Sequence, residues 1–261
     1  MIRTITATRY VTPLREGGSL PAIVEGDDDG TYVLKFRGAG QGPRALIAEL
    51  VSGEIGRYLG LRVPEIVLIY LDPRMAKTEP DPEIQDLLRA SEGLNIALDY
   101  LPGSISYDPV ADANIDARLA SAIVWFDALV TNVDRTPRNT NLLVWHRELW
   151  LIDHGASLYF QHNWESGTIA RAGAPFAAIR EHVLLPRASA ILEVDAELAP
   201  QLTADVLDTI VQLIPGSWLY DVELFATPNE HRAAYRDWLL QRLEAPRRWV
   251  EEAARARTLL V

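Results

Sequence analysis

Cysteine is absent from the 261-residue chain, which excludes disulfides, thiolate metal sites and a cysteine nucleophile. No apolar run reaches the roughly 18 to 20 residues that a membrane-spanning helix needs. The most apolar segment, 117–133, is interrupted by Arg118 and Asp127. The N-terminus lacks the basic and then apolar plan of a signal peptide. These absences favour a cytoplasmic protein that does not bind membranes.

Positive charge is scarce in the chain. Lys and Arg number 25 against 36 Asp and Glu, so the formal net charge is −11 at pH 7. A net-negative surface repels phosphate backbones, which argues against binding of nucleic acid by the protein itself. The five histidines show no His-Glu-x-x-His spacing, so a zinc hydrolase is disfavoured as well.

The first hundred residues have the pattern of strands around one main helix. Residues 26–30 form a Gly- and Asp-rich turn between two apolar runs, which is typical of a β-hairpin. Apolar residues at helical spacing predict a helix over 47–58, closed by Gly60 and Pro64, and a shorter one near 84–90. The expected strands cover residues 4–10, 22–25, 31–36, 65–71 and 94–101.

The second half is predicted to be mainly helical. Apolar residues at helical offsets between 115 and 133 indicate one apolar face of a long helix. Two short strands are expected over 141–145 and 149–152, and helices over 206–214 and 231–257, the last bent near Pro246.

A boundary at Pro102-Gly103 separates these two halves. It divides the chain into residues 1–101, with the strands, and residues 102–261, with most of the helices. The sequence therefore predicts an α+β protein with a cleft between a strand-rich part and a helical part.

Three polar side chains follow the long predicted helix in an order that points to phosphoryl transfer. Asp134 and Asn139 lie in one loop, and Asp153-His154-Gly155 ends the second short strand. Phosphoryl transfer uses one Asp to orient the attacking hydroxyl and accept its proton, and an Asn and another Asp to hold Mg²⁺. We expect Gly155 to allow the metal-binding turn to approach closely. Asp134 and Asn139 alone, or Asp153 alone, would be typical of an ordinary turn.

These motifs resemble the protein-kinase-like fold, and more narrowly the HipA-like kinases, the bacterial family that includes the persistence toxin. Arg135 follows the catalytic Asp, as it does in this family and in the phosphoinositide kinases. The resemblance covers residues 10–160 and implies a two-lobed fold with a β-rich N-lobe and a mainly helical C-lobe. The narrower match also rests on Gly17-Gly18-Ser19-Leu20-Pro21, Tyr32-Val33-Leu34-Lys35-Phe36 and the segment from Glu49 to Pro64.

The resemblance implies that ATP and Mg²⁺ bind to the protein. It makes Asp134 the catalytic base and assigns the metal to Asn139 and Asp153. Lys35, paired with Glu49, would contact the α- and β-phosphates. Further nucleotide contacts are implied for Gly17, Gly18 and Ser19 over the phosphates and for Asp99, Tyr100 and Leu101 at the adenine. Ser19 also lies near the place of an autophosphorylated serine in the family, which suggests self-phosphorylation.

One of these assignments has a competitor, and two neighbouring residues have plainer interpretations. Glu54 lies on the same predicted helix as Glu49, but Glu49 is preferred as the partner of Lys35 because it lies nearer the helix start. His154 stands where the family motif has Phe, and we expect it to form hydrogen bonds rather than act as a base. Asn141 is expected to satisfy backbone groups of the loop.

The acceptor hydroxyl is expected on a Ser or Thr of a protein rather than on a small molecule. A lipid or small-molecule kinase is the alternative among enzymes, although no basic amphipathic stretch is present to dock on an anionic membrane. An ATP-binding pseudokinase or regulatory module is the alternative from another class. An antitoxin-like partner is known in the family, but this sequence gives it no support. The last hundred residues carry no motif.

Overall fold

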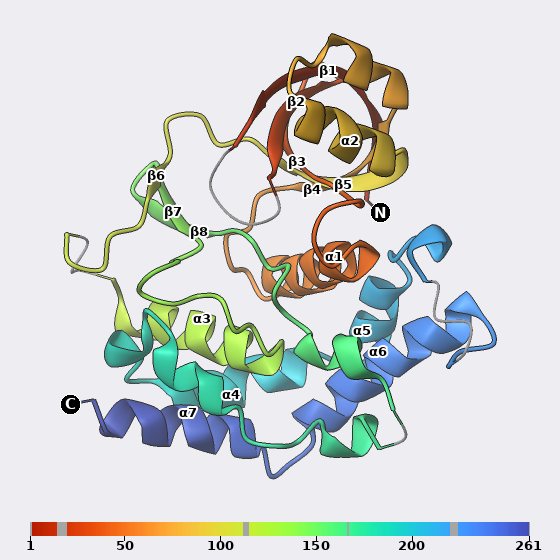
Figure 1. Cartoon of the computed structure of the whole chain (residues 1–261). Helices are drawn as coiled ribbons and strands as arrows, with labels where there is room; N and C mark the ends of the chain where they lie inside the picture. The colour runs from red at the N-terminus through yellow and green to blue at the C-terminus, as the bar shows by residue number, and fades with distance from the viewer. Residues whose placement is uncertain (1, 15–19, 112–114, 166, 220–223, 261) are drawn as a thin grey trace.

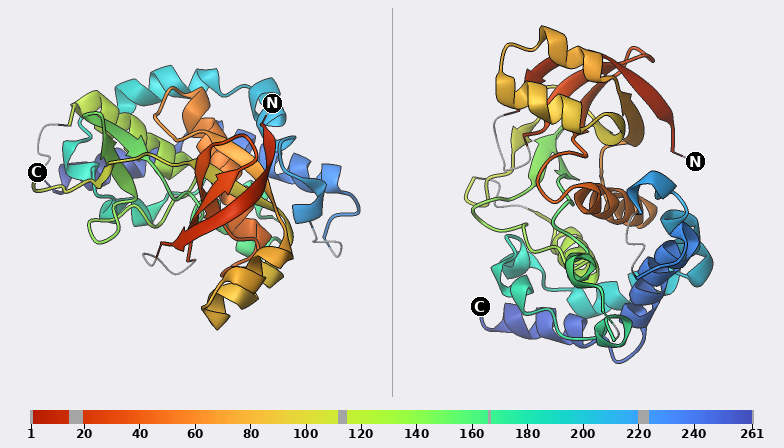
Figure 2. Two further views of the ribbon diagram at one scale, coloured as in Figure 1. Left: turned by 90° about the horizontal axis from the view of Figure 1, so that it is seen from above. Right: turned by 45° about the vertical axis from the view of Figure 1, so that its right-hand side comes forward.

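The computed structural model describes residues 2–14, 20–111, 115–165, 167–219 and 224–260. A closed five-stranded barrel lies at one end of the molecule and most of the helices lie at the other (Figures 1 and 2). The strand order is β1-β2-β3-β5-β4. Strands β1 and β4 are parallel, and the other neighbours are antiparallel. The strands are β1 (Thr4–Pro13), β2 (Ala22–Gly26), β3 (Thr31–Lys35), β4 (Ile66–Leu71) and β5 (Gly93–Asp99).

Alternating burial along the strands builds the interior of the barrel. Every second residue of β2 and β3 is buried, with Ala22 and Val24 on one strand and Tyr32 and Leu34 on the next. This period of two is the pattern of a sheet that packs one face against a core. All five strands expected from the sequence are present, with ends that differ by up to three residues. The closure through the parallel pairing of β1 with β4 joins distant segments and was not predicted.

Helix α1 (Pro43–Tyr58) lies between the barrel and the remaining helices (Figure 1). Pro43 stands in its first turn, where the missing N–H costs no hydrogen bond. Most of the helix is buried, including Glu49. The helix is followed by Gly60, whose φ of 79° is one that residues with a side chain adopt only at a cost. The buried surroundings of α1 hold Glu49 in a fixed position.

Helix α2 (Pro82–Ala90) lies across an open end of the barrel (Figure 1). The side chain of Asp81 caps its N-terminus by accepting a hydrogen bond from the backbone N–H of Glu83. Ile84 and Leu88 from this helix join the apolar cluster that fills the barrel. The short predicted helix near residues 84–90 is therefore confirmed.

Helix α3 (Ala117–Leu129) is the central helix of the other end of the molecule. Asp116 caps it by accepting from the backbone N–H groups of Arg118 and Leu119. The expectation of a longer helix with one apolar face was wrong in both respects. The helix ends at Leu129, and residues 123–129 are all buried because other helices surround it. Asp127 lies within this buried stretch.

Four further helices complete this end of the molecule. They are α4 (Ile191–Leu198), α5 (Ala204–Val211), α6 (Pro228–Leu243) and α7 (Arg248–Thr258). Three of them, α4, α6 and α7, pack against α3, whereas α5 packs against α6 and α1. The single bent helix expected over 231–257 is two helices, because the chain leaves helical geometry at Glu244 before Pro246. Helix α4 was not predicted. Short 3₁₀ helices connect the elements at Pro73–Thr78, Tyr159–Asn163, Ile169–Arg171, Ala177–Glu181, Leu185–Arg187, Ala199–Gln201 and Gly216–Trp218.

A small antiparallel sheet precedes the predicted metal-binding turn. One of its strands comes before α3 in the chain, and the other two come after it. The sheet contains β6 (Ile105–Ser106), β7 (Leu142–Trp145) and β8 (Glu148–Leu151) in that order. The β7–β8 turn places His146 and Arg147 at φ of 50° and 66°, as a tight two-residue hairpin requires. No helix in the described part of the chain is long and apolar enough to cross a membrane.

Candidate active site

Lys35, Glu49 and Asp153 meet although they come from three different elements. Lys35 ends β3, Glu49 lies in α1, and Asp153 follows β8. The Lys35 Nζ atom lies 2.5 Å from Glu49 Oε2 and 2.6 Å from Asp153 Oδ1. The Glu49 side chain is fully buried, whereas 42 % of the Asp153 side chain is exposed. The ammonium group therefore connects a buried carboxylate to one that faces solvent.

Mutual attraction keeps this cluster charged. Burial alone would lower the pKa of Lys35, but the charges of Asp153 and Glu49 outweigh burial and raise it above its usual value. Burial alone would raise the pKa of Glu49, but the charge of Lys35 and the hydrogen bond with His154 hold it well below its usual range. Glu54, the competing candidate, instead pairs with Arg57 at 3.2 Å.

The turn after β8 contains an uncommon backbone conformation of the kind that clusters at functional sites. Asp153 has a φ of 57°, in the left-handed region that residues other than Gly seldom adopt. His154 is fully buried, with Nδ1 3.4 Å from Glu49 Oε1 and its ring edge against Phe126. Gly155 is not sterically required here: an added Cβ would lie 3.7 Å from Asp153 Oδ1, which is ordinary contact. The protein therefore leaves room for a Cβ at Gly155, and a close approach of this turn to metal stays a prediction.

The loop after α3 holds Asp134 through three asparagines. Asn139 Nδ2 donates to Asp134 Oδ2 at 2.8 Å. Asn141 Nδ2 lies 3.2 Å from both the carbonyl and the Oδ2 atom of Asp134, so it satisfies a backbone group as expected and also binds the carboxylate. The backbone N–H of Asp134 donates to Asn132 Oδ1 at 3.1 Å. Asn132 was not among the site residues predicted from the sequence.

Arg135 lies beneath this loop and joins it to the Asp153 turn. Its side chain is 1 % exposed, and Nη1 donates to the carbonyls of Asn141 and, at 3.3 Å, Ile152. The backbone N–H of Ile152 also donates to the Asn141 carbonyl at 3.1 Å. Asp134 and Asp153 therefore belong to two loops that share backbone and side-chain hydrogen bonds.

Oxygen atoms suited to Mg²⁺ are available in both loops. Asn139 binds Asp134 through its amide nitrogen, so its Oδ1 atom remains a candidate ligand, as does the second carboxylate oxygen of the exposed Asp153. No group of three His, Asp or Glu side chains with metal-binding geometry occurs in the described ranges. The donor set fits a cation that takes one or two protein ligands and completes its shell with phosphate oxygens and water.

The remaining predicted nucleotide contacts lie in two segments. Gly17, Gly18 and Ser19 fall outside the described residues. The backbone N–H groups of Asp99 and Tyr100 donate to the carbonyls of Glu65 and Thr31, respectively, at 2.8 and 3.0 Å. The Leu101 carbonyl accepts from Ser104 at 3.2 Å. The segment 99–101 therefore already uses two amides and one carbonyl within the protein.

Comparison with known proteins identifies the family. The model of the HipA-like kinase family matches residues 8–252. The chain belongs to the HipA-like kinase family. The match extends far beyond residues 10–160, where the motifs were recognised, and includes most of the C-terminal segment that carries no motif. A comparison with curated protein sequences finds no match.

Solved kinase structures share the fold of this HipA-like kinase. The Helicobacter pylori proinflammatory kinase CtkA superposes with a TM-score of 0.57 at 12 % identity, and the alignment covers 99 % of both chains. The Golgi casein kinase with Mn/ADP bound gives a TM-score of 0.55 at 11 % identity, covering 97 % of this chain and 74 % of the other. At these identities the likeness establishes a protein-kinase-like fold with mixed helices and strands.

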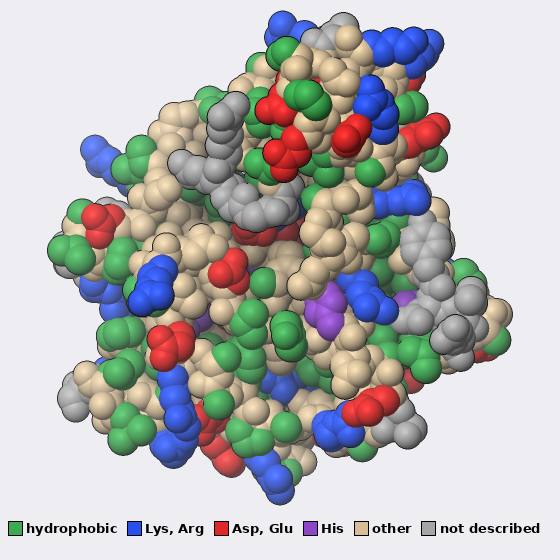
Figure 3. Space-filling model, viewed as in Figure 1, with side chains coloured by type: hydrophobic (Ala, Val, Ile, Leu, Met, Phe, Trp, Pro, Cys, Tyr) green, Lys and Arg blue, Asp and Glu red, His purple; other side chains and the backbone are tan. Residues whose placement is uncertain are grey.

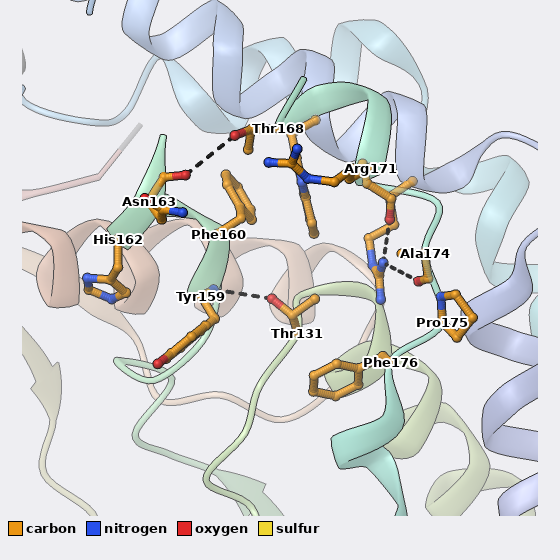
Figure 4. A pocket seen from close by; sticks show the side chains of 13 residues that line it. Thr131, Tyr159, Phe160, His162, Asn163, Thr168, Arg171, Ala174, Pro175 and Phe176 are labelled. Carbon is orange, nitrogen blue, oxygen red and sulfur yellow. Dashed lines mark hydrogen bonds between the residues drawn. The ribbon is translucent and has the colours of Figure 1, made fainter. Parts of the chain in front are cut away.

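A separate pocket of about 570 Å³ opens in the helical part of this HipA-like kinase (Figure 4). Thr131, at the start of the Asp134 loop, lines it together with aromatic side chains that include Tyr159 and Phe176. The Thr131 Oγ1 atom accepts from the Tyr159 backbone N–H at 3.2 Å. Lys35, Asp134 and Asp153 are not among its lining residues.

Arg242, from α6, lies in the wall of this pocket. Its guanidinium donates to the carbonyls of Ala128 and Leu129 at the end of α3 and to that of Ala172. It also lies 5.3 Å from the ring centre of Trp238. Because α3 leads directly into the Asp134 loop, Arg242 fixes the point at which that loop begins.

Proposed function

We propose that this protein is an ATP- and Mg²⁺-dependent kinase that transfers the γ-phosphoryl group to a Ser or Thr hydroxyl of a protein. The observation that carries the proposal is the cluster of Lys35, Glu49 and Asp153, joined by Arg135 to the loop that presents Asp134. A phosphotransferase needs a fixed cation for the nucleotide phosphates, a carboxylate for metal and a carboxylate for the acceptor hydroxyl. The cluster supplies the cation and the carboxylate for metal, and the loop that Arg135 joins to it supplies Asp134 for the hydroxyl.

Each side chain has one task in the proposed reaction. Lys35 holds the α- and β-phosphates, and the buried carboxylate of Glu49 keeps its ammonium charged and oriented. Asn139 and Asp153 would hold Mg²⁺, which when bound neutralises negative charge on the phosphates. Asp134 faces the acceptor hydroxyl. The resemblance to the family assigns residues 17–19, which lie outside the described residues, to the phosphates and residues 99–101 to the adenine.

The transfer forms one phosphorus–oxygen bond and breaks another. The acceptor oxygen attacks the γ-phosphorus, and the bond between that phosphorus and the β–γ bridging oxygen breaks. The acceptor proton passes to the Asp134 carboxylate, and ADP leaves with the electron pair of the broken bond. Asn139 and Asn141, which both donate to Asp134 Oδ2, hold this carboxylate in position before the proton arrives.

A protein acceptor is preferred over a lipid. Lys and Arg side chains are interspersed with Asp and Glu on the face seen in Figure 3, and the chain carries a formal charge of −11. Docking on an anionic membrane is favoured by clustered basic residues instead. The proposal includes a nucleotide site between an N-lobe of residues 1–101 and a C-lobe of residues 102–261.

Intact-mass spectrometry after incubation with Mg²⁺ and ATP tests the proposal. Wild type should gain about 80 Da per phosphate, on itself or on an added protein acceptor, and Asp134→Ala should gain none. Titration calorimetry should show that Asp134→Ala still binds ATP, whereas Asp153→Ala binds metal–ATP more weakly. Fragmentation then shows whether Ser19 is modified.

Three outcomes would overturn the proposal. Phosphorylation by Asp134→Ala at nearly the wild-type rate would remove Asp134 from its assigned role. A wild-type protein that binds ATP but modifies neither itself nor protein acceptors would support the regulatory alternative. Transfer to phosphoinositide vesicles or to small alcohols alone would support the lipid or small-molecule alternative.

A further inference from the structure

A buried polar cluster lies directly behind the Asp134 loop. Asp127, Arg135 and His182 are 0, 1 and 5 % exposed. Asp127 Oδ2 lies 2.6 Å from Arg135 Nε and 2.9 Å from His182 Nε2. Its Oδ1 atom accepts from Asn132 Nδ2 at 2.8 Å. Both oxygens of the one buried carboxylate are thus bound by side chains from the loop and from the segment before α4.

The hydrogen bonds define the tautomer of His182. The backbone N–H of Leu184 donates to His182 Nδ1 at 3.0 Å, so Nδ1 carries no proton and Nε2 donates to Asp127. Burial lowers the pKa of His182, although Asp127 acts in the opposite direction. Burial alone would raise the pKa of Asp127, but the charge of Arg135 and the His182 hydrogen bond hold it well below its usual range. The cluster therefore contains one anion, one cation and one neutral imidazole.

Two chains of contacts lead from Asp127 to the proposed reacting groups. One passes through Arg135, which holds the carbonyls of Asn141 and Ile152, each close in sequence to a proposed metal ligand. The other passes through Asn132, which binds Asp127 with its amide and the Asp134 backbone N–H with its carbonyl oxygen. Asp127 therefore acts on both loops of the site through Arg135 and Asn132. None of the described bonds joins it to the proposed metal ligands.

Stability alone is a weak reason to bury such a pair. Taking an ion pair out of water costs several kcal/mol, and well-packed apolar residues often serve equally well. Geometry is a stronger reason, because a displacement of about 1 Å at a reacting group can cost on the order of 100-fold in rate. The cluster lies where Arg135 binds the carbonyl of Ile152 beside the Asp153 turn and Asn132 binds the backbone of Asp134.

We propose that Asp127 and His182 are positioning residues for phosphoryl transfer, which orient Arg135 and thereby set the spacing between Asp134 and Asp153. This inference rests on the proposed kinase function. Neither residue touches the nucleotide or the acceptor. His182 contributes by directing its Nε2 proton to Asp127, and the backbone N–H of Val183 adds to the arrangement by donating to the Arg135 carbonyl at 3.0 Å.

Matched substitutions at His182 separate positioning from packing. His182→Gln places an amide near the position of Nε2 and keeps a donor to Asp127. His182→Asn places its amide near Nδ1 and loses that donor. Both substituted side chains are polar, and neither is larger than the side chain of His182. We expect His182→Asn to lower kcat by about 10-fold or more while His182→Gln stays within about threefold of wild type.

Asp127→Asn and Asp195→Asn form a second matched pair. Asp195, on α4, binds Trp125 of α3 and Arg247, and therefore supports the same helix away from the loop. Asp127→Asn should lower kcat by about 10- to 100-fold with KM for ATP changed by less than about threefold. Asp195→Asn should lower the unfolding temperature and leave kcat within about twofold of wild type.

The measurement is phosphate transfer from [γ-³²P]ATP to the chain and to casein, with Mg²⁺, at a temperature at which every variant is fully folded by circular dichroism. Wild-type kcat and KM are the reference. If wild type is active and both Asp127→Asn and His182→Asn keep its kcat, the positioning role is refuted and the kinase function stands. If wild type transfers no phosphate, the kinase function and this inference fall together. Should Asp127→Asn not fold, the two His182 variants decide.

Discussion

The ammonium of Lys35 and the carboxylate of Asp153 lie 2.6 Å apart, although 118 positions separate them in the chain. This contact joins the end of a barrel strand to the turn after β8. Glu49 completes the cluster at 2.5 Å from the same nitrogen. Nucleotide phosphates that bind Lys35 would therefore enter a site whose cation is already held by two carboxylates.

Replacement of Lys35 by Met should destabilise the protein and abolish ATP binding. The change leaves the fully buried Glu49 without its ammonium, and removal of one partner from a buried ion pair costs about 3 kcal/mol. Urea unfolding measures this loss. The double variant Lys35→Met, Glu49→Leu should recover part of the stability but no ATP binding. A single variant as stable as wild type would contradict the stabilising role of the pair.

Replacement of Asn141 by Asp should alter the pH dependence of the reaction. Asn141 Nδ2 lies 3.2 Å from Asp134 Oδ2, so the substitution places a second negative charge against the proposed base. Like charges disfavour ionisation, and the acid limb of the kcat–pH profile should move up by about one pH unit. Asn141→Gly accepts the φ of 47° at this position and removes the donor without adding charge. An unchanged profile in Asn141→Asp would remove Asp134 as the titrating base.

The neutral, buried imidazole of His182 should make the protein less stable in mild acid. Burial lowers its pKa below the value of about 6.5 expected in the unfolded chain. The unfolded chain therefore binds a proton that the native state does not, and the unfolding free energy falls as the pH drops below about 6.5, by up to about 1.4 kcal/mol per pH unit. Urea unfolding at pH 7.5 and 5.5 should show a smaller loss in His182→Gln than in wild type. Equal losses would contradict this explanation.

Gly155 should tolerate alanine, whereas Gly60 should not. A Cβ at Gly155 would meet its neighbours at 3.7 Å or more, so the unfolding free energy should change by less than about 0.5 kcal/mol. Gly60, at a φ of 79° after α1, should cost about 1 kcal/mol when replaced by Ala, because the left-handed conformation is strained. Thermal unfolding of both variants tests this contrast. If Gly155→Ala unfolds at the wild-type temperature but loses ATP binding, the close approach involves the nucleotide instead.

The sequence predicted the local elements of the barrel and not its closure. The five strands follow from runs of β-branched and apolar residues and from turn residues such as Gly26 and Gly30, which are local signals. The parallel pairing of Thr4 with Leu68 depends on contacts between distant segments, for which a single sequence carries no signal. The extent of α3 was misjudged because apolar spacing was followed from 115 to 133, whereas the helix covers Ala117–Leu129 and its residues 123–129 are all buried.

The motif residues of the site could be selected from sequence because their chemistry is specific, whereas their supports could not. Lys35 lies against Glu49 as the resemblance implied, whereas its contact with Asp153 was not predicted, and the roles of all three residues remain predictions. Asp127 was noticed only as an interruption of an apolar run. A carboxylate in such a run needs a buried partner, and that requirement was the available signal. His182 stands in no recognisable pattern and becomes visible only through its contact with Asp127.

The guanidinium of Arg242 on the carbonyls of Ala128 and Leu129 has a consequence for protein engineering. Helix α6 supplies hydrogen bonds that end α3 immediately before the Asp134 loop, so the C-terminal hundred residues cannot be treated as a detachable module. A shortened version that stops near residue 160, where the recognisable motifs end, would leave those carbonyls without their cap. Chimeras that exchange acceptor-binding regions between relatives must therefore transfer α3 and α6 as one unit.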